Sequence, residues 1–190
     1  MTRKILERST LKPGKSELQL IEMEKGRLFV DMDGTLAEWR TISVSSEEEL
    51  YRILKGHEYY RTLNPYINVV EGMRHFIQTS HVEVYIASCY FPDSTAKEQK
   101  NDWLNEFLPE IPEANRIFIP VGERKAGAIP GGVKKADILL DDFTQNLLQW
   151  PGLGIKLINP INHTRRTWKG GRIGYEVAPE KIAKYLEELF

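Results

Sequence analysis

The sequence has little cysteine, no long apolar run and no excess of charge of one sign. Cys89 is the single cysteine among 190 residues, which excludes an internal disulfide and is typical of proteins in a reducing compartment. No apolar run approaches the roughly 18–20 residues that a membrane span needs, and the first residues lack the apolar centre of a signal peptide. These absences predict a cytoplasmic protein without a membrane segment.

The charges nearly cancel, because 26 Lys and Arg residues stand against 27 Asp and Glu residues. A dedicated nucleic-acid binder normally shows a clustered basic excess, so nucleic acid is not the expected partner. The histidines show no spacing of zinc ligands; they are His57, His75, His81 and His163. No internal repeat is present, and the length suits one domain with a full core.

Strands and helices alternate along most of the chain. Apolar runs rich in β-formers predict strands at 27–33, 82–88, 116–121, 136–142 and 154–159. Helical periodicity and capping residues predict helices at 45–56, 69–80, 93–108, 143–150 and 179–190. The expected N-caps of the first and third helices are Ser45 or Ser46, and Asp93 or Ser94. This order predicts an α/β fold, a Rossmann-like parallel sheet with helices on both faces.

One stretch, residues 37–69, interrupts this alternation directly after the first strand and is rich in aromatic residues. In sheets of this kind ligands bind at the carboxyl ends of the strands. We therefore expect a small helical cap over that edge. The core then comprises 27–36 and 70–190, and residues 1–26 form an N-terminal extension of unknown role. In the segment 161–178, which has no assigned role, the letters WKGGRI predict a hairpin turn.

Acidic residues end two of the predicted strands. Asp31 and Asp33 are two apart, so in an extended strand their side chains point to the same side. Asp141 and Asp142 end a second strand, and parallel strands present their carboxyl ends at one edge. Such a concentration of like charge is tolerable around a hard cation, and carboxylate oxygens suit Mg²⁺.

Groups that bind phosphate are expected at the same edge. Ser88 ends the second strand, and Lys125, Lys134 and Lys135 lie between the third and fourth strands, where any of them could reach a phosphate. Gly34 allows a sharp turn and a close approach of the backbone. Because Mg²⁺ favours few carboxylates together with phosphate oxygens, the residues predict a phosphate-binding magnesium site.

Four features follow one another along the chain: the letters DMDGT at 31–35, the strand-end serine, a lysine and the terminal Asp–Asp pair. In kind and order they resemble the four motifs of the haloacid-dehalogenase superfamily. The resemblance implies that Asp31 is the nucleophile that forms an aspartyl-phosphate and that Asp33 is the general acid and base. It implies that Lys125, with Lys134 as the alternative, and Ser88 bind the phosphate.

The same resemblance implies the metal ligands. These are Asp31, Asp33, Asp141 and Asp142 around Mg²⁺, with Asp142 favoured over Asp141 for direct contact. A carboxylate becomes a competent nucleophile toward phosphorus once cations cancel the repulsion between the anions.

A narrower resemblance is to the 5'(3')-deoxyribonucleotidases of the cytosolic type and their bacterial relatives. It rests on the stretches 31–39, 59–73 and 137–150. In that group an aromatic residue after the first motif packs on the base, which implies this role for Trp39. The alternative for Trp39 is packing between cap and core.

The remaining substrate-site candidates are weaker. Tyr60, with neighbouring Tyr59, is a second aromatic candidate for contact with the substrate. Thr35 is expected as a turn residue with its hydroxyl near the phosphate. Cys89 lies beside Ser88 at the expected substrate edge and is expected to be a small buried apolar residue.

Together these features predict a Mg²⁺-dependent phosphomonoesterase for (deoxy)nucleoside monophosphates. The alternatives are a phosphatase or phosphotransferase for another small phosphometabolite such as a sugar phosphate, a nucleic-acid 3'-phosphatase and a non-catalytic binding module. The same core serves several of these functions, since specificity resides in the cap. A homodimer is a further, open expectation.

Overall fold

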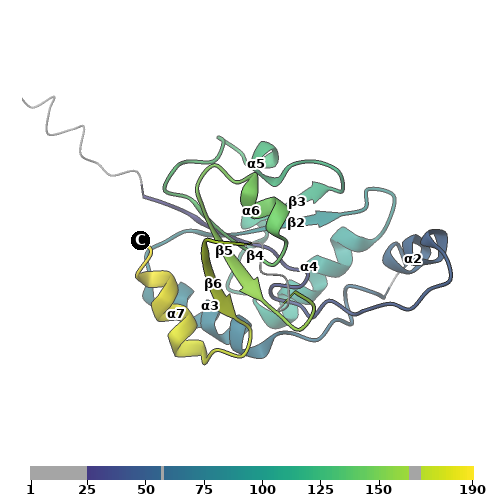
Figure 1. The fold of residues 1–190 in the computed structure, drawn as a ribbon, viewed down its shortest axis with the longest axis horizontal. Helices are drawn as coiled ribbons and strands as arrows, with labels where there is room; N and C mark the ends of the chain where they lie inside the picture. Colours follow the sequence, from purple (N-terminus) through teal and green to yellow (C-terminus); the bar gives the residue numbers. More distant parts are fainter. Residues whose placement is uncertain (1–24, 57, 163–167) are drawn as a thin grey trace, which may run out of the picture.

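The computed structural model describes residues 25–56, 58–162 and 168–190. Within them six parallel strands form one sheet in the order β3-β2-β1-β4-β5-β6 (Figure 1). The strands are β1 (Leu28–Val30), β2 (Val84–Tyr90), β3 (Arg116–Pro120), β4 (Ile138–Asp141), β5 (Leu153–Ile158) and β6 (Gly171–Gly174). The predicted α/β class with a Rossmann-like parallel sheet is confirmed.

Helices cover both faces of this sheet, with α3 and α7 on one side and α5 and α6 on the other (Figure 1). None of the helices in the described ranges is long and apolar enough to cross a membrane. The helices are α2 (Glu47–Leu54), α3 (Ile67–Thr79), α4 (Ala96–Phe107), α5 (Lys125–Ala128), α6 (Thr144–Leu148) and α7 (Pro179–Glu187), with the short 3-10 helix η2 (Glu113–Asn115).

The central strand β1 supplies both hydrophobic cores. Leu28 and Val30 join the core beneath α3, α4 and α7, whereas Phe29 joins the core beneath α5 and α6. All three side chains are fully buried, as expected for a parallel strand covered on both faces. Asp31 follows immediately, so the apolar strand ends where the sheet reaches its carboxyl edge.

Between β1 and α3 the chain leaves the sheet and forms a projection that carries α2 (Figure 1). Ser46 caps α2 by accepting a hydrogen bond from the Glu49 amide at 3.2 Å. The two linkers run together, since the Glu38 amide donates to the Asn64 carbonyl at 2.8 Å. This projection, residues 37–56 and 58–66, is called the cap below. The division into cap and core domains stays a prediction.

Two local predictions differ from the structure, and one helix was not predicted. The predicted hairpin turn is wrong, because Gly171–Gly174 is strand β6 and pairs in parallel with β5. Sheet pairing there overrides the turn preference of its glycines. Helix α4 begins at Ala96 with Thr95 as N-cap, later than predicted, because Ser94 Oγ binds the Phe91 carbonyl and the Ala96 amide in a turn. The short helix α5 was not predicted.

Part of the prediction lies outside the described residues. This concerns residues 1–24 of the N-terminal extension, together with His57 and His163.

Gly72 brings helices α3 and α7 into close contact. A Cβ at this position would lie 2.7 Å from Ile182 Cβ and 3.1 Å from the Pro179 carbonyl oxygen. We predict that Gly72→Ala lowers the free energy of unfolding by about 1–3 kcal/mol, the usual cost of overpacking a core. Denaturant titration measures this, with Gly127→Ala as control because its Cβ would meet nothing within 4 Å. A Gly72→Ala protein as stable as the wild type would contradict the close packing.

Candidate active site

Three neighbouring strands bring polar side chains to one edge of the sheet. β1 lies between β2 and β4, with Val30 in register with Ile86 and Leu140. Asp31 therefore follows β1 beside Asp141 at the end of β4, as the order of parallel strands predicts.

The loop after β1 is a tight turn that brings its backbone against the end of β4. The amides of Thr35, Leu36 and Ala37 all donate to the Met32 carbonyl, at 2.8–3.2 Å. Gly34 has φ +77°, and a Cβ on it would lie 2.6 Å from an Asp142 carboxylate oxygen. Only glycine therefore fits between this loop and Asp142.

Lys125, the first residue of α5, joins two of the acidic residues. Its Nζ lies 2.8 Å from Asp31 Oδ1 and 2.7 Å from Asp141 Oδ2, and the residue is only 4% exposed. Burial disfavours the charged ammonium, yet Asp141 and Asp31 raise the pKa of Lys125 above its ordinary value. Of the three candidate lysines it is the one with these ion pairs. Lys135 is exposed, and Lys134 donates its backbone amide to Asp137.

Asp141 is saturated with donors from the protein. Besides Lys125, the Asn146 side chain donates to it at 2.9 Å and the Phe143 amide at 2.7 Å. Burial raises the pKa of the Asp141 carboxyl to about 6, although Lys125 opposes this shift. Asp141 therefore contacts both the lysine and the loop that follows β4.

The Asp142 carboxylate has fewer hydrogen-bond donors than Asp141 to offset the negative charge around it. Burial raises the pKa of its carboxyl to about 7, and the neighbouring charges of Asp31 and Asp141 add to the shift. Its backbone amide donates to the buried Thr35 hydroxyl at 3.1 Å. Carboxylate oxygens of Asp31, Asp141 and Asp142 all lie within 4.8 Å of one another, so these residues form a group that could hold a metal ion.

Asn159, just after β5, links Asp142 to the loop that follows β1. Its Nδ2 donates to Asp142 Oδ2 at 3.0 Å and to the Gly34 carbonyl at 2.8 Å. Its own Oδ1 accepts from the amides of Ile161 and Asn162 at 3.0 Å. The sequence reasoning missed Asn159, although an asparagine at the end of a strand on the acidic edge was an available signal.

Asp33 does not join the three carboxylates but faces a different lysine. Lys100 of α4 is fully buried, pairs with Asp33 Oδ2, and donates to Ser88 Oγ at 3.0 Å and to the Cys89 carbonyl at 2.6 Å. Burial raises the pKa of Asp33 above its ordinary value, against the opposing charge of Lys100. Asp33 Oδ1 is buried and accepts no hydrogen bond from the described residues.

Lys100 is the second residue that sequence reasoning missed. It lies one helical turn from Ala96 and one from Leu104, both buried. A lysine on the buried face of an amphipathic helix needs a partner in the interior. That position was the signal that could have found it.

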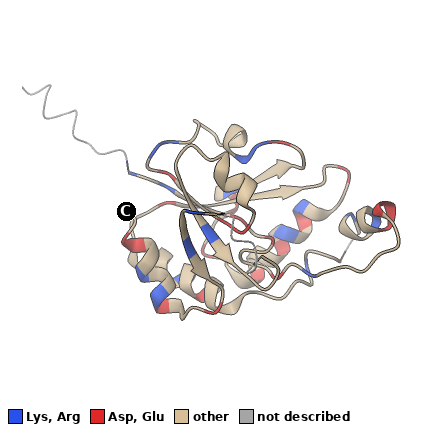
Figure 2. Ribbon diagram, in the orientation of Figure 1, with Lys and Arg blue, Asp and Glu red and all other residues tan. Residues whose placement is uncertain are grey.

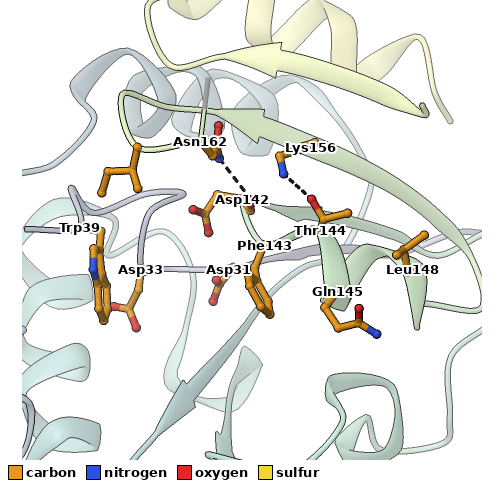
Figure 3. A pocket seen from close by; sticks show the side chains of 11 residues that line it. Asp31, Asp33, Trp39, Asp142, Phe143, Thr144, Gln145, Leu148, Lys156 and Asn162 are labelled. Carbon is orange, nitrogen blue, oxygen red and sulfur yellow. Dashed lines mark hydrogen bonds between the residues drawn. The ribbon is translucent and has the colours of Figure 1, made fainter. Parts of the chain in front are cut away.

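A cavity of about 620 Å³ opens over these groups (Figure 3). Asp31, Asp33 and Asp142 lie on its floor with the indole of Trp39 to one side and the exposed ring of Phe143 to the other (Figure 3). Thr144, Gln145, Leu148, Lys156, Ile161 and Asn162 complete the lining. Trp39 also packs edge-on against Tyr59, with ring centroids 5.8 Å apart.

The other predicted substrate residues lie around this cavity without lining it. Tyr60 is 2% exposed, and its ring centroid lies 4.6 Å from Lys100 Nζ. Cys89 is half-buried, and burial raises the pKa of its thiol. Thr35 and Ser88 are buried beneath the floor. The roles predicted for all these residues stay predictions.

The raised pKa of Asp142 gives a pH-dependent stability with a defined sign. Its folded value of about 7 lies above the ordinary 3.8, so the folded protein binds more protons than the unfolded chain between these values. Stability without metal should therefore fall as the pH rises from 4 to 7. We predict that Asp142→Asn, in chelator at pH 8, is more stable than the wild type by on the order of 3 kcal/mol.

Thermal unfolding at pH 4 and pH 8 measures this difference, which should vanish at pH 4. Mg²⁺ supplies the second arm: at pH 8 it should raise the melting temperature of the wild type and have little effect on the variant. An Asp142→Asn protein that is less stable than the wild type at pH 8 in chelator would contradict the electrostatic account.

Two known proteins are similar to the chain in sequence. A 5'(3')-deoxyribonucleotidase of Bacillus subtilis (strain 168) and one of Bacillus phage SPbeta are each 28% identical to the chain over 120 residues. Each alignment covers 62% of this chain and 62% of the relative, so the chain matches less than two thirds of either relative's length.

The model of a protein family matches a longer region, residues 31–170. This region is most of the chain, and it contains the three clustered carboxylates together with Lys100 and Lys125. The family resemblance seen in the sequence is therefore confirmed: the chain belongs to the family described as 5' nucleotidase, deoxy (pyrimidine), cytosolic type C.

Proposed function

We propose that the chain is a Mg²⁺-dependent phosphomonoesterase that hydrolyses (deoxy)nucleoside monophosphates through an aspartyl-phosphate. The observation that carries this proposal is the buried Lys125 ammonium between Asp31 and Asp141. Of these, Asp31 lines the cavity that Trp39 also lines. Family membership and the printed activity of the two Bacillus relatives support it.

The residues fit a divalent cation. Three carboxylates converge, while Lys125 supplies one positive charge to this group, and burial with mutual repulsion raises the pKa of two of them. Oxygen donors of this kind suit Mg²⁺. Because Asp141 already accepts three hydrogen bonds, Asp31 and Asp142 are the better direct ligands. When bound, Mg²⁺ would neutralise the charge of a substrate phosphate.

In the first step an Asp31 carboxylate oxygen attacks phosphorus, and the bond between phosphorus and the nucleoside oxygen breaks. Asp33, which lines the same cavity with a raised pKa, donates a proton to the departing oxygen. Lys125 orients Asp31 through a 2.8 Å contact and offsets the anionic charge that would otherwise repel the phosphate.

In the second step water attacks the phosphorus of the aspartyl-phosphate. Asp33, now deprotonated, takes a proton from this water, the bond between Asp31 and phosphorus breaks, and inorganic phosphate leaves. The Lys100 ammonium favours the charged state of Asp33 that this step needs, while burial favours the protonated state that the first step needs.

The cavity supports a small substrate with a flat apolar part. Its volume of about 620 Å³ lies within the usual range of small-molecule sites, and two aromatic rings, Trp39 and Phe143, flank the acidic floor. Lys/Arg and Asp/Glu are interspersed along the described ribbon (Figure 2), which does not favour the basic groove of a nucleic-acid 3'-phosphatase.

A panel of phosphomonoesters tests the proposal. We predict Mg²⁺-dependent phosphate release with a preference for nucleoside monophosphates over ribose 5-phosphate, other sugar phosphates and a 3'-phosphorylated oligonucleotide. Asp31→Asn keeps the shape of the side chain but removes the nucleophile, and should lower kcat by roughly a thousandfold or more. Glu123→Gln, which changes an exposed acid between β3 and α5, is the matched control and should retain full activity.

Each outcome of the panel has a distinct meaning. Activity on sugar phosphates alone would keep the aspartate chemistry and refute the nucleotide substrate. Nucleotide hydrolysis that survives in Asp31→Asn would refute the mechanism.

The indole of Trp39 should contribute to binding through the base. We predict that Trp39→Ala raises the KM for nucleoside monophosphates about tenfold, the loss of one aromatic contact, and leaves hydrolysis of ribose 5-phosphate unchanged. The KM of Trp39→Phe should lie between the values of Trp39→Ala and the wild type. An equal loss on both substrates, accompanied by a lower melting temperature, would assign Trp39 to packing against Tyr59 instead.

A further inference from the structure

Helix α4 holds the cap through a buried side-chain amide. Gln99 is 3% exposed; its Nε2 donates to the Gly56 carbonyl at 2.6 Å, and its Oε1 accepts from the amides of Tyr60 at 2.9 Å and Arg61 at 3.4 Å. One side chain thus satisfies both a donor and an acceptor of the cap backbone. A buried side-chain amide whose nitrogen and oxygen both bind backbone groups fixes the position and orientation of that backbone.

Trp103 lies one turn further along α4 and supports the same segment. Its indole nitrogen donates to the Leu63 carbonyl at 2.8 Å, and the side chain is fully buried. Residues four apart on a helix share a face, so Gln99 and Trp103 form one seat for residues 58–66 of the cap.

Two exposed ion pairs also join the cap to the core. Lys55 pairs with Asp93 at 2.5 Å and Arg61 with Asp102 at 3.3 Å, and in each pair one or both side chains are about half exposed or more. Exposed ion pairs contribute little to stability. Of these polar contacts, the buried ones from Gln99 and Trp103 therefore fix the cap on α4 more firmly than the ion pairs do.

The residue after Gln99 enters the active site. Lys100 pairs with Asp33 and donates to Ser88, and the Tyr60 ring covers its ammonium at 4.6 Å. Tyr60 is the same residue whose amide Gln99 holds. One turn of α4 thus fixes both the ammonium and the aromatic ring above it.

We propose that Gln99 is a positioning residue that couples the seating of the cap to the Lys100 ammonium. With the cap seated, Tyr60 excludes water from Lys100 and keeps it directed at Asp33 and Ser88. When the hydrogen bonds of Gln99 break, Tyr60 moves off with the cap backbone, and water reaches the ammonium. Lys125 is held by Asp31 and Asp141 of the core and is independent of this seat.

Amine labelling tests the coupling without any assay of activity. The full chain is treated with a low dose of acetic anhydride, and the acetylation of each lysine is read by peptide mass spectrometry. In Gln99→Leu we expect labelling of Lys100 to rise roughly tenfold, the effect of about one lost hydrogen bond on an opening equilibrium. Labelling of Lys125 should stay at the wild-type rate. Gln78→Leu, the same change at an exposed position of α3, is the control and should alter neither rate.

Two variants of Tyr60 keep the test decisive if Gln99→Leu folds poorly. Tyr60→Ala removes the ring and should raise the labelling of Lys100 although Gln99 is intact. Tyr60→Phe retains the ring and should leave the labelling of Lys100 low. Equal increases at Lys100 and Lys125, or no increase at Lys100 in a folded variant, would overturn the proposal. The first result would mean general loosening, and the second would mean that the seat does not cover Lys100.

The kinetic arm rests on the proposed function. Gln99→Leu should lower kcat about tenfold, as small displacements of catalytic groups do, with little change in KM for a small phosphomonoester, when measured at a temperature where the variant is folded. If the wild type releases no phosphate from any substrate, the proposed function fails, while the labelling result still decides the role of Gln99. An unchanged kcat in a variant whose Lys100 is labelled faster would show that the Tyr60 ring over Lys100 has no part in the reaction.

Discussion

The ion pair of Lys125 with Asp31 and Asp141 is the interaction on which the rest of the site depends. A parallel sheet places the ends of its strands side by side, so acidic residues at two neighbouring ends repel each other at short range. Lys125 lies within 2.8 Å of one and 2.7 Å of the other. Its position at the start of α5 follows from the chain emerging from β3 at the same edge. Without this cation the ends of β1 and β4 would separate or take up protons.

The structure gives each of the first two aspartates its own cation. Asp31 faces Lys125, which comes from the core, whereas Asp33 faces Lys100, which lies under the cap. Two carboxylates only two residues apart thereby acquire different surroundings. The mechanism proposed above needs two carboxylates with different roles, and different surroundings are how proteins separate such roles. In this protein the surroundings differ because a different helix reaches each residue.

The sequence predicted the sheet and its acidic edge, because apolar runs and strand-end aspartates follow directly from local periodicity. Spacing alone did not separate Lys125 from Lys134 and Lys135, since it does not specify the path of a loop, and only the family resemblance favoured Lys125. Lys100 was missed because its partner is 67 residues away and a lysine in a polar helix reads as solvated. Strand β6 was missed because its glycines favour turns, and only pairing with β5 makes them a strand.

The two hydrogen bonds from Asn159 have a consequence for how the protein folds. One runs to the Gly34 carbonyl, 125 residues earlier in the chain, and the other to Asp142. This link to the loop after β1 therefore forms only after β4 and β5 have been added to the sheet. Such distant pairing is slow to form, because chain entropy must be lost before the contact is made. A nascent chain that ends before β5 has all four aspartates but lacks the hydrogen bonds of Asn159 to Gly34 and Asp142, so this part of the acidic edge is completed late, as the last strands assemble.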